Sequence, residues 1–296
     1  MKEKLAVVLA VVFLPVFFLA FDYPETKNAG QAVLFGSAEK TASCGENKYC
    51  GEKTEVTCNG CKQEQLALLR TMSEYQETVA ECLSDYFGFA PPKKIFYIVR
   101  EPKGTLCTRD ACINEGISFN GAVSFAEFPS ITRFGELPEN GNIQADVHET
   151  AHAFEFHALG SGIPKWFDEG LAIQTDARLN CHPKQFPEKR MGDEKLGPVL
   201  LQLKNGEKIS EIIAHPTEHD RGAAFFYALE KELECGKECA ARLFKQLHAL
   251  RVEKIAQGKG FSHASPFPTN EIIKQETEKI TGKDASWLFE ALEISK

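Results

Sequence analysis

The stretch that most constrains this chain is residues 145–154, in which two histidines stand four positions apart. On a helix that turns by about 100° per residue, His148 and His152 lie about 40° apart on one face, and Glu149 lies about 100° from His148. Two imidazoles separated by one helical turn can bind one divalent ion, and zinc suits nitrogen donors. The run therefore predicts a helix with a metal-binding face.

The opposite face of this helix predicts close packing. Its apolar residues follow the helical spacings i, i+4, i+7 and i+11, and they are Val147, Ala151, Phe154 and Ala158. Small residues among them allow a neighbouring element to come close. We therefore expect a helix that is buried behind and functional in front.

The metzincin pattern, which also begins with His-Glu-x-x-His, does not fit the chain. It would place a glycine at position 155 and a histidine at position 158, where this chain has Glu155 and Ala158. His157 is one residue out of phase, and we expect it to be a solvated histidine. The third ligand therefore has to come from a later segment.

A later segment supplies a candidate. After Gly160 and Gly162, which allow a turn, residues 164–172 read PKWFDEGLA and begin with a helix-opening proline. With the first run, this segment resembles the gluzincin signature, in which a Trp-x-x-Glu-Gly-x-Ala helix packs antiparallel on the His-Glu-x-x-His helix. The resemblance implies that Glu169 joins His148 and His152 as the third ligand of one zinc ion per chain.

The resemblance also implies a reaction, the hydrolysis of peptide bonds by a zinc-activated water molecule. In that family the glutamate between the two histidines is the general base, which is Glu149 here. Gluzincins place a tyrosine or histidine after the third ligand to stabilise the oxyanion. His219 is the candidate in this chain, with Tyr227 or Arg221 as substitutes.

One position departs from the family pattern. Many gluzincins carry an aspartate four residues after the third ligand, bonded to a ligand imidazole, but that position is Ile173 here. Asp176 is a candidate replacement on the same helix face, and the alternative is an ordinary exposed carboxylate. Asp168 is not expected to be a ligand, because it faces about 100° away from Glu169. The departure concerns the orientation of the imidazoles rather than the ligand set.

The expected partner is a peptide or protein substrate. In gluzincins an edge strand beside the zinc helix pairs with an extended peptide. The segment from Ile117 to Phe128 matches that strand in position, and the alternative is an ordinary core strand. Nucleic acid is not expected, because the net charge is −8, with 34 basic and 42 acidic residues, and no basic cluster is interleaved with aromatic residues.

Two other functions stay open on the sequence alone. The first is an exported, non-catalytic surface or binding domain that keeps the zinc helices for structural reasons. Glu149 argues against it, because a structural zinc site has no use for a carboxylate that is not a ligand. The second is a zinc hydrolase that acts on a non-peptide amide.

The N-terminus predicts export. Residues 5–21 form an apolar run preceded by Lys2 and Lys4. At about 1.5 Å per residue the run extends over about 25 Å, slightly less than a hydrocarbon core of about 30 Å. Residues 1–21 are therefore predicted to be a cleaved signal peptide or an N-terminal membrane anchor, and either places the rest of the chain outside the cytoplasm.

The ten cysteines suit an exported protein with disulfides. Eight of them fall in close pairs and two could pair at long range: Cys44 with Cys50, Cys58 with Cys61, Cys107 with Cys112, Cys235 with Cys239, and Cys82 with Cys181. Spacing alone does not fix the connectivity. Gly236 suggests a turn that would let Cys235 and Cys239 bridge. The alternative is a zinc knuckle formed by Cys44, Cys50, Cys58 and Cys61.

The order of the other segments predicts an α+β fold. Residues 63–87 carry apolar residues at helical spacing, residues 94–100 read as a buried strand, weaker strand candidates lie within 105–133, and helices follow. We expect a small mixed or antiparallel sheet before a mainly helical part, with the active-site helix between them. A Cys-rich lead-in over 22–62 would precede a gluzincin-like domain over 63–296.

Overall fold

The computed structural model describes residues 40–59, 63–100, 116–119, 122–125, 143–179, 193–259 and 266–295. All of them belong to the unit Glu39–Lys296. The predicted signal peptide or anchor and the first part of the lead-in lie outside the described residues. Within the described stretches, no helix is both long enough and apolar enough to cross a bilayer.

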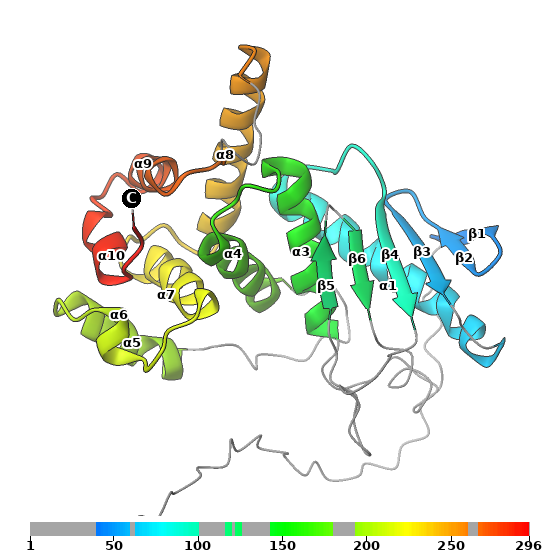
Figure 1. The fold of residues 1–296 in the computed structure, drawn as a ribbon, viewed down its shortest axis with the longest axis horizontal. Helices are drawn as coiled ribbons and strands as arrows, with labels where there is room; N and C mark the ends of the chain where they lie inside the picture. Colours follow the sequence, from blue (N-terminus) through cyan, green and yellow to red (C-terminus); the bar gives the residue numbers. More distant parts are fainter. Residues whose placement is uncertain are drawn as a thin grey trace, which may run out of the picture. The chain divides into compact units, whose positions relative to one another are not determined.

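A six-stranded sheet comes first in the chain (Figure 1). Its strand order is β1-β2-β3-β4-β6-β5, with the bounds Ala42–Gly45, Lys48–Cys50, Thr54–Asn59, Ile95–Arg100, Ala122–Phe125 and Gly116–Phe119. β3, β4 and β6 run parallel, and the strands at both edges pair antiparallel with their neighbours. This mixed sheet confirms the predicted α+β class, and β4 confirms the strand predicted at 94–100.

The predicted lead-in is not separate from the domain at its C-terminal end. Residues 42–59 form β1, β2 and β3, and β3 pairs with β4 in parallel over six positions. The physical reason is a period of two: Thr54, Val56 and Cys58 are all buried, as the inward side of a strand requires. Residues 42–59, which were predicted to belong to the lead-in, are therefore part of the same sheet as β4.

The single strand predicted from Ile117 to Phe128 is a hairpin instead. β5 and β6 pair antiparallel, with Phe119 opposite Ala122, and β5 is the edge strand of the described sheet. The sequence between them is Asn120-Gly121, a pair that favours a tight hairpin turn. The edge strand is therefore shorter than predicted.

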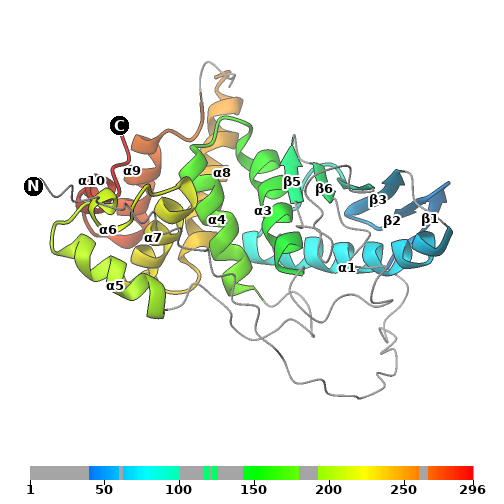
Figure 2. The ribbon, with the colours of Figure 1, turned by 60° about the horizontal axis from the view of Figure 1, so that its bottom comes forward.

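Nine helices complete the described part of the chain: α1 Gln63–Phe87, α3 Ile143–Leu159, α4 Lys165–Arg178, α5 Asp193–Lys204, α6 Ile209–Ile212, α7 Glu218–Lys231, α8 Cys239–Ala256, α9 Asn270–Thr281 and α10 Ser286–Ala291. Helix α1 confirms the helix predicted at 63–87. It lies along one face of the sheet, while α3 stands beside β5, between the sheet and the other helices (Figure 1 and Figure 2). Helix α3 carries both His148 and His152.

An aromatic cluster joins the two sides of the fold. The ring of Phe87 at the end of α1 lies 5.8 Å from Phe154 of α3 and 4.3 Å from Phe244 of α8, centroid to centroid. All three side chains are fully buried. Burying a side chain of this size contributes roughly 1.5–3 kcal/mol. The cluster therefore fixes α3 between the sheet and the helices.

Two predicted disulfides are present among the described residues, Cys44–Cys50 and Cys235–Cys239. Gly236, at a φ of 80°, provides the turn expected between the second pair. Cys58 and Cys82 are also disulfide-bonded, and the pairings predicted for them involve cysteines outside the described residues, as does Cys107 with Cys112. The alternative of a four-cysteine zinc knuckle is wrong, because three of its four members are oxidised.

Candidate metal centre

Helix α3 is held by its apolar back. The four residues of the expected packing stripe are buried: Val147, Ala151, Phe154 and Ala158. One contact with the sheet is polar, because the hydroxyl oxygens of Tyr97 in β4 and Thr150 in α3 lie 3.0 Å apart in the core. The helix is therefore fixed in rotation, with both histidines on the opposite face.

A tight turn joins α3 to α4. Gly160 has a φ of 89°, a conformation that glycine adopts without strain, and its N–H donates to Phe156 O at 2.8 Å. Arg251 of α8 donates to the carbonyl oxygen of Ala158 at 2.9 Å, which satisfies one of the last carbonyls of α3. The turn sends α4 back along α3.

The three predicted ligands converge. The Nε2 atoms of His148 and His152 are 3.2 Å apart, and Glu169 Oε2 lies 3.3 Å from the first and 3.5 Å from the second. In a tetrahedral site with bonds of about 2.05 Å, neighbouring ligand atoms are separated by about 3.3 Å. The spacing therefore fits three ligands of one tetrahedral metal ion.

The burial of Glu169 supports the same reading. The residue is 6% exposed, and its buried Oε2 atom accepts no hydrogen bond from any described residue. The surrounding imidazole nitrogens and this oxygen are all electron-pair donors, which repel one another unless a proton or cation lies between them. Two imidazoles and one carboxylate are a donor set that zinc accepts. The residues present therefore fit the metal that the resemblance implies.

His219 also comes to the cluster. Helices α4 and α7 touch at two glycines, where a Cβ on Gly170 would lie 2.5 Å from Gly222 Cα. The hydroxyl of Thr217 caps α7 by accepting from Asp220 N. As a result, His219 in the first turn of α7 places Nε2 2.9 Å from Glu169 Oε2, although its side chain is 56% exposed.

The other two candidates for this role point elsewhere. Arg221 donates to the carbonyl oxygen of Pro216 and to Glu218, both in the turn that starts α7. Tyr227 is 7% exposed, and its ring lies 5.7 Å from the ammonium of Lys231. Of the three alternatives, His219 is the one that the structure brings to the predicted ligands.

Asp168 is a site residue that the sequence reasoning missed. Its Oδ1 accepts from His152 Nδ1 at 3.0 Å, and Nε2 of the same ring faces Glu169 and His148. The acid that forms a hydrogen bond with the His152 imidazole is thus Asp168, whereas the predicted candidate was Asp176. Although Asp168 faces about 100° away from Glu169, it reaches the ring nitrogen of His152 that points away from Glu169. The sequence feature that could have indicated this contact is an acid directly before the third ligand.

The charges in the cluster act on one another. Burial lowers the pKa of His152, but its hydrogen bond with Asp168 and the negative charges of Asp168 and Glu169 outweigh it and raise the pKa to about 9. Burial raises the pKa of Asp168, but His152 outweighs it and lowers the pKa to about 2. Against burial, contacts with His148, His152 and Lys165 hold the pKa of Glu169 well below its usual range. Both acids of α4 are therefore anionic at neutral pH.

Glu155 lies behind the ligands. It is fully buried one turn after His152, and neither carboxyl oxygen has a hydrogen-bond partner among the described residues. One oxygen comes within 4.8 Å of atoms from both His152 and Asp168. Burial and the negative charge of Asp168 raise the pKa of Glu155 well above its usual value. Burial beside an ionised acid therefore favours the protonated form of Glu155.

Glu149 is half-buried on α3 between the two histidines. It does not belong to the set of donor atoms that lie close together at His148, His152 and Glu169. Glu149 makes no hydrogen bond or ion pair with another residue in the described part of the chain. A partly exposed acid that is not itself a ligand fits the position of a proton acceptor.

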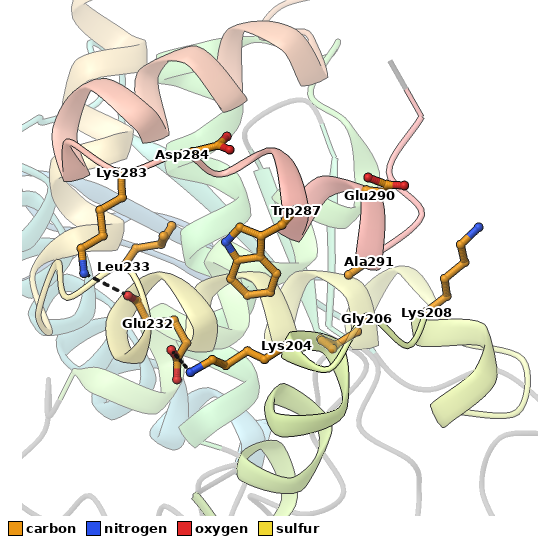
Figure 3. Close-up of a pocket in the computed structure, with 11 residues that line it drawn as sticks. Lys204, Gly206, Lys208, Glu232, Leu233, Lys283, Asp284, Trp287, Glu290 and Ala291 are labelled. Atoms are coloured by element: carbon orange, nitrogen blue, oxygen red, sulfur yellow. Dashed lines mark hydrogen bonds and ion pairs between the residues drawn. The ribbon is translucent and has the colours of Figure 1, made fainter.

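A cavity of about 490 Å³ lies away from this centre. Its lining residues come from α5, from α10 and from the segments that follow α5, α7 and α9, and Trp287 projects its indole into the space (Figure 3). Lys204 forms an ion pair with the Glu232 carboxylate, and Lys283 donates to the Glu232 carbonyl oxygen. None of the residues of the metal centre lines this cavity.

No protein-family model matches the chain, and no curated protein matches it either. Function is therefore inferred from the geometry of α3, α4 and α7 and from the resemblance of their two motifs to gluzincins.

Proposed function

We propose that this protein is a gluzincin-type zinc metallopeptidase that acts outside the cytoplasm. The observation that carries the proposal is the convergence of His148, His152 and Glu169 through atoms 3.2–3.5 Å apart. The unsatisfied Oε2 of Glu169 adds to it, because a buried lone pair needs a partner. Three protein ligands leave a fourth position for water, which is the pattern of catalytic zinc.

The roles of the residues follow from their chemistry. A bound zinc ion supplies Lewis acidity, which lowers the pKa of a coordinated water molecule towards neutrality. His148, His152 and Glu169 hold the ion, and Asp168 keeps His152 in the tautomer that offers Nε2. Glu149 accepts the proton of the attacking water and passes it to the leaving amine.

His219 is proposed to stabilise the oxyanion of the tetrahedral intermediate. Its Nε2 lies beside Glu169 Oε2, so it borders the metal cluster on the side of α7. The exposure of 56% leaves the ring room to turn toward a substrate carbonyl. Removing one such donor costs about 10²–10³ in kcat in other hydrolases.

The proposed substrate is an extended peptide. β5 (Gly116–Phe119) is the edge strand of the described sheet and the strand beside α3 (Figure 1). Edge strands present unpaired backbone N–H and C=O groups that a peptide can pair with. A peptide added to β5 would lie next to α3, the helix that carries His148 and His152.

The proposed location rests on the disulfides. Cys44–Cys50 and Cys235–Cys239 favour an oxidising compartment. Residues 1–21, which would direct export or anchor the chain, remain a sequence-based proposal.

The test is Glu149→Gln. The amide keeps the size of the side chain but cannot accept the proton, so cleavage of a peptide library should fall by about 10²–10⁴ while zinc content stays at one per chain. Glu74→Gln, which changes a half-buried carboxylate of α1, is the matched control and should cleave like the unmodified protein. Equal activity of Glu149→Gln would refute the general base.

The non-catalytic alternative makes a different prediction. Under it, the unmodified protein binds one zinc ion and cleaves nothing in a broad peptide library or in unfolded proteins. Chelation would then destabilise the fold without removing any activity. Chelator-sensitive cleavage by the unmodified protein excludes this alternative.

A further inference from the structure

Lys165, the first residue of α4, contacts both acids of the metal centre. Its ammonium lies 2.6 Å from Glu169 Oε1 and 3.0 Å from Asp168 Oδ2. The three residues occupy positions i, i+3 and i+4 of one helix, so one lysine side chain can bridge both carboxylates. Each acid thus has one oxygen committed to Lys165.

The other oxygen of each acid faces α3. Asp168 Oδ1 lies 3.0 Å from His152 Nδ1, and Glu169 Oε2 lies 3.3 Å from His148 Nε2. The terminal torsion of a glutamate has a broad, two-fold preference, so a free carboxylate could turn both oxygens toward an ion. Lys165 opposes that rotation, because Oε1 would have to leave its ion pair.

Helix stability alone does not explain this lysine. The N-terminus of a helix carries a partial positive charge, which disfavours a cation in the first turn. The side chain of Lys165 is 62% exposed, and an isolated exposed ion pair contributes little. The carboxylates that it bridges are instead 8% and 20% exposed, so the contact orders two largely buried acids.

We infer that Lys165 is a positioning residue that makes Glu169 bind the metal ion through one oxygen and holds Asp168 against His152. The inference deepens the proposed function and rests on it, because it concerns the same metal centre. One oxygen of Glu169 and two imidazoles leave a coordination position for water. A second oxygen of Glu169 would add a fifth ligand beside that water.

The experiment uses cobalt(II) as the probe in the full chain after the native metal is removed. Four-coordinate cobalt(II) absorbs visible light more intensely than five-coordinate cobalt(II), so the spectrum reports whether Glu169 donates one oxygen or two. Lys165→Met should shift the spectrum to the weaker five-coordinate form and lower kcat/KM about tenfold, in the range typical of groups that orient ligands.

Two variants serve as controls. In Lys165→Arg the guanidinium can still bridge two carboxylates, so both the spectrum and kcat/KM should return towards the values of the unmodified protein. Lys195→Met removes the same charge from an exposed position of α5 and should change neither. A purely electrostatic or helix-stabilising role would not move the cobalt spectrum.

The outcomes separate the two proposals. Identical spectra and identical kcat/KM for Lys165→Met and the unmodified protein would overturn the positioning role and leave the peptidase standing. Absence of both cobalt binding and cleavage in the unmodified protein would overturn the peptidase and the positioning role together.

Discussion

Two buried glutamates of this fold have opposite surroundings. Glu77 of α1 is 1% exposed, and its oxygens accept from Lys53 N at 2.8 Å and from the Thr54 hydroxyl at 2.6 Å. Glu169 of α4 is 6% exposed, but its Oε2 accepts no hydrogen bond from the described residues. On the sheet side both oxygens of the acid accept hydrogen bonds, whereas at the α3–α4 contact only Oε1 has a partner, the ammonium of Lys165.

The difference in hydrogen bonding distinguishes a structural carboxylate, Glu77, from a candidate metal ligand, Glu169. Leaving a buried acceptor without a partner costs about 1–3 kcal/mol, and a fold that satisfies Glu77 is able to avoid that cost. At Glu169, Lys165 is paired with Oε1, but the atoms nearest to Oε2 are imidazole nitrogens of His219, His148 and His152. Hydrogen bonds within the protein satisfy the first carboxylate, whereas at the second a proton on an imidazole or a bound cation has to lie between the nitrogen and oxygen atoms.

The largest effect is expected from exchanging each glutamate for glutamine. Glu169→Gln removes the anionic ligand, so zinc affinity should fall by more than the roughly 10- to 100-fold cost of losing an outer-shell partner, and cleavage should be lost. Glu77→Gln replaces one accepting oxygen by an NH2 donor, so either the Lys53 N–H or the Thr54 hydroxyl loses its acceptor, and the free energy of unfolding should fall by about 1–3 kcal/mol. Equilibrium dialysis with metal analysis and urea unfolding measure the two effects.

The comparison requires that Glu169→Gln affects zinc binding and that Glu77→Gln affects only the stability of the fold. Glu77→Gln should still bind one zinc ion per chain, because its site lies at the contact of α1 with β3. Zinc binding retained by Glu169→Gln, or lost by Glu77→Gln, would show that unsatisfied burial does not mark the metal centre.

A smaller effect is expected from Asp168→Asn. An asparagine oxygen can still accept from His152 Nδ1, but the residue loses the charge that strengthens this hydrogen bond and the ion pair with Lys165. Zinc affinity, measured by competition with a chelator, should fall by about 10- to 100-fold with all three ligands intact. Asp85→Asn on the exposed side of α1 should have no effect. Unchanged affinity in Asp168→Asn would mean that packing, not Asp168, orients the ring.

Much of the fold could be predicted because the spacing of apolar residues along the sequence matches the helices and strands of the structure. The 63–87 helix has a long apolar stripe, and its bounds match α1. The strands of 42–59 were missed, because their period-two signal is short and lies among glycines, lysines and cysteines. The 117–128 segment was read as one strand although Asn120-Gly121 favours a turn, since its hydrophobic residues continue on both sides.

The site divides in the same way. His148 and His152 follow from spacing within one helix, and the structure brings them together with Glu169, which came from a family resemblance. The contacts of Asp168, Lys165 and Glu155 depend on how α4 packs against α3. A single helix gives the direction of a side chain, but its partner across a helix–helix contact is set by packing.

The smallest effect concerns a second unsatisfied acid, Glu155 of α3. Burial, together with the charge of Asp168, raises the pKa of Glu155 above its ordinary value of 4.5. Below pH 4.5 the group is protonated in both the folded and the unfolded states and contributes no pH dependence. Above that pH the unfolded chain releases the proton while the folded chain keeps it, so this contribution to stability falls as pH rises towards the folded-state pKa.

Glu155→Gln removes this pH dependence, because the amide does not titrate. In the metal-free protein, the free energy of unfolding of the variant minus that of the unmodified protein should become more favourable to the variant from pH 5 to pH 8. Urea unfolding at several pH values measures it, and the other titrating groups largely cancel in the difference. A difference that stays constant with pH would show that Glu155 ionises in the folded protein as it does in water, and its burial beside Asp168 would then need a cation of its own.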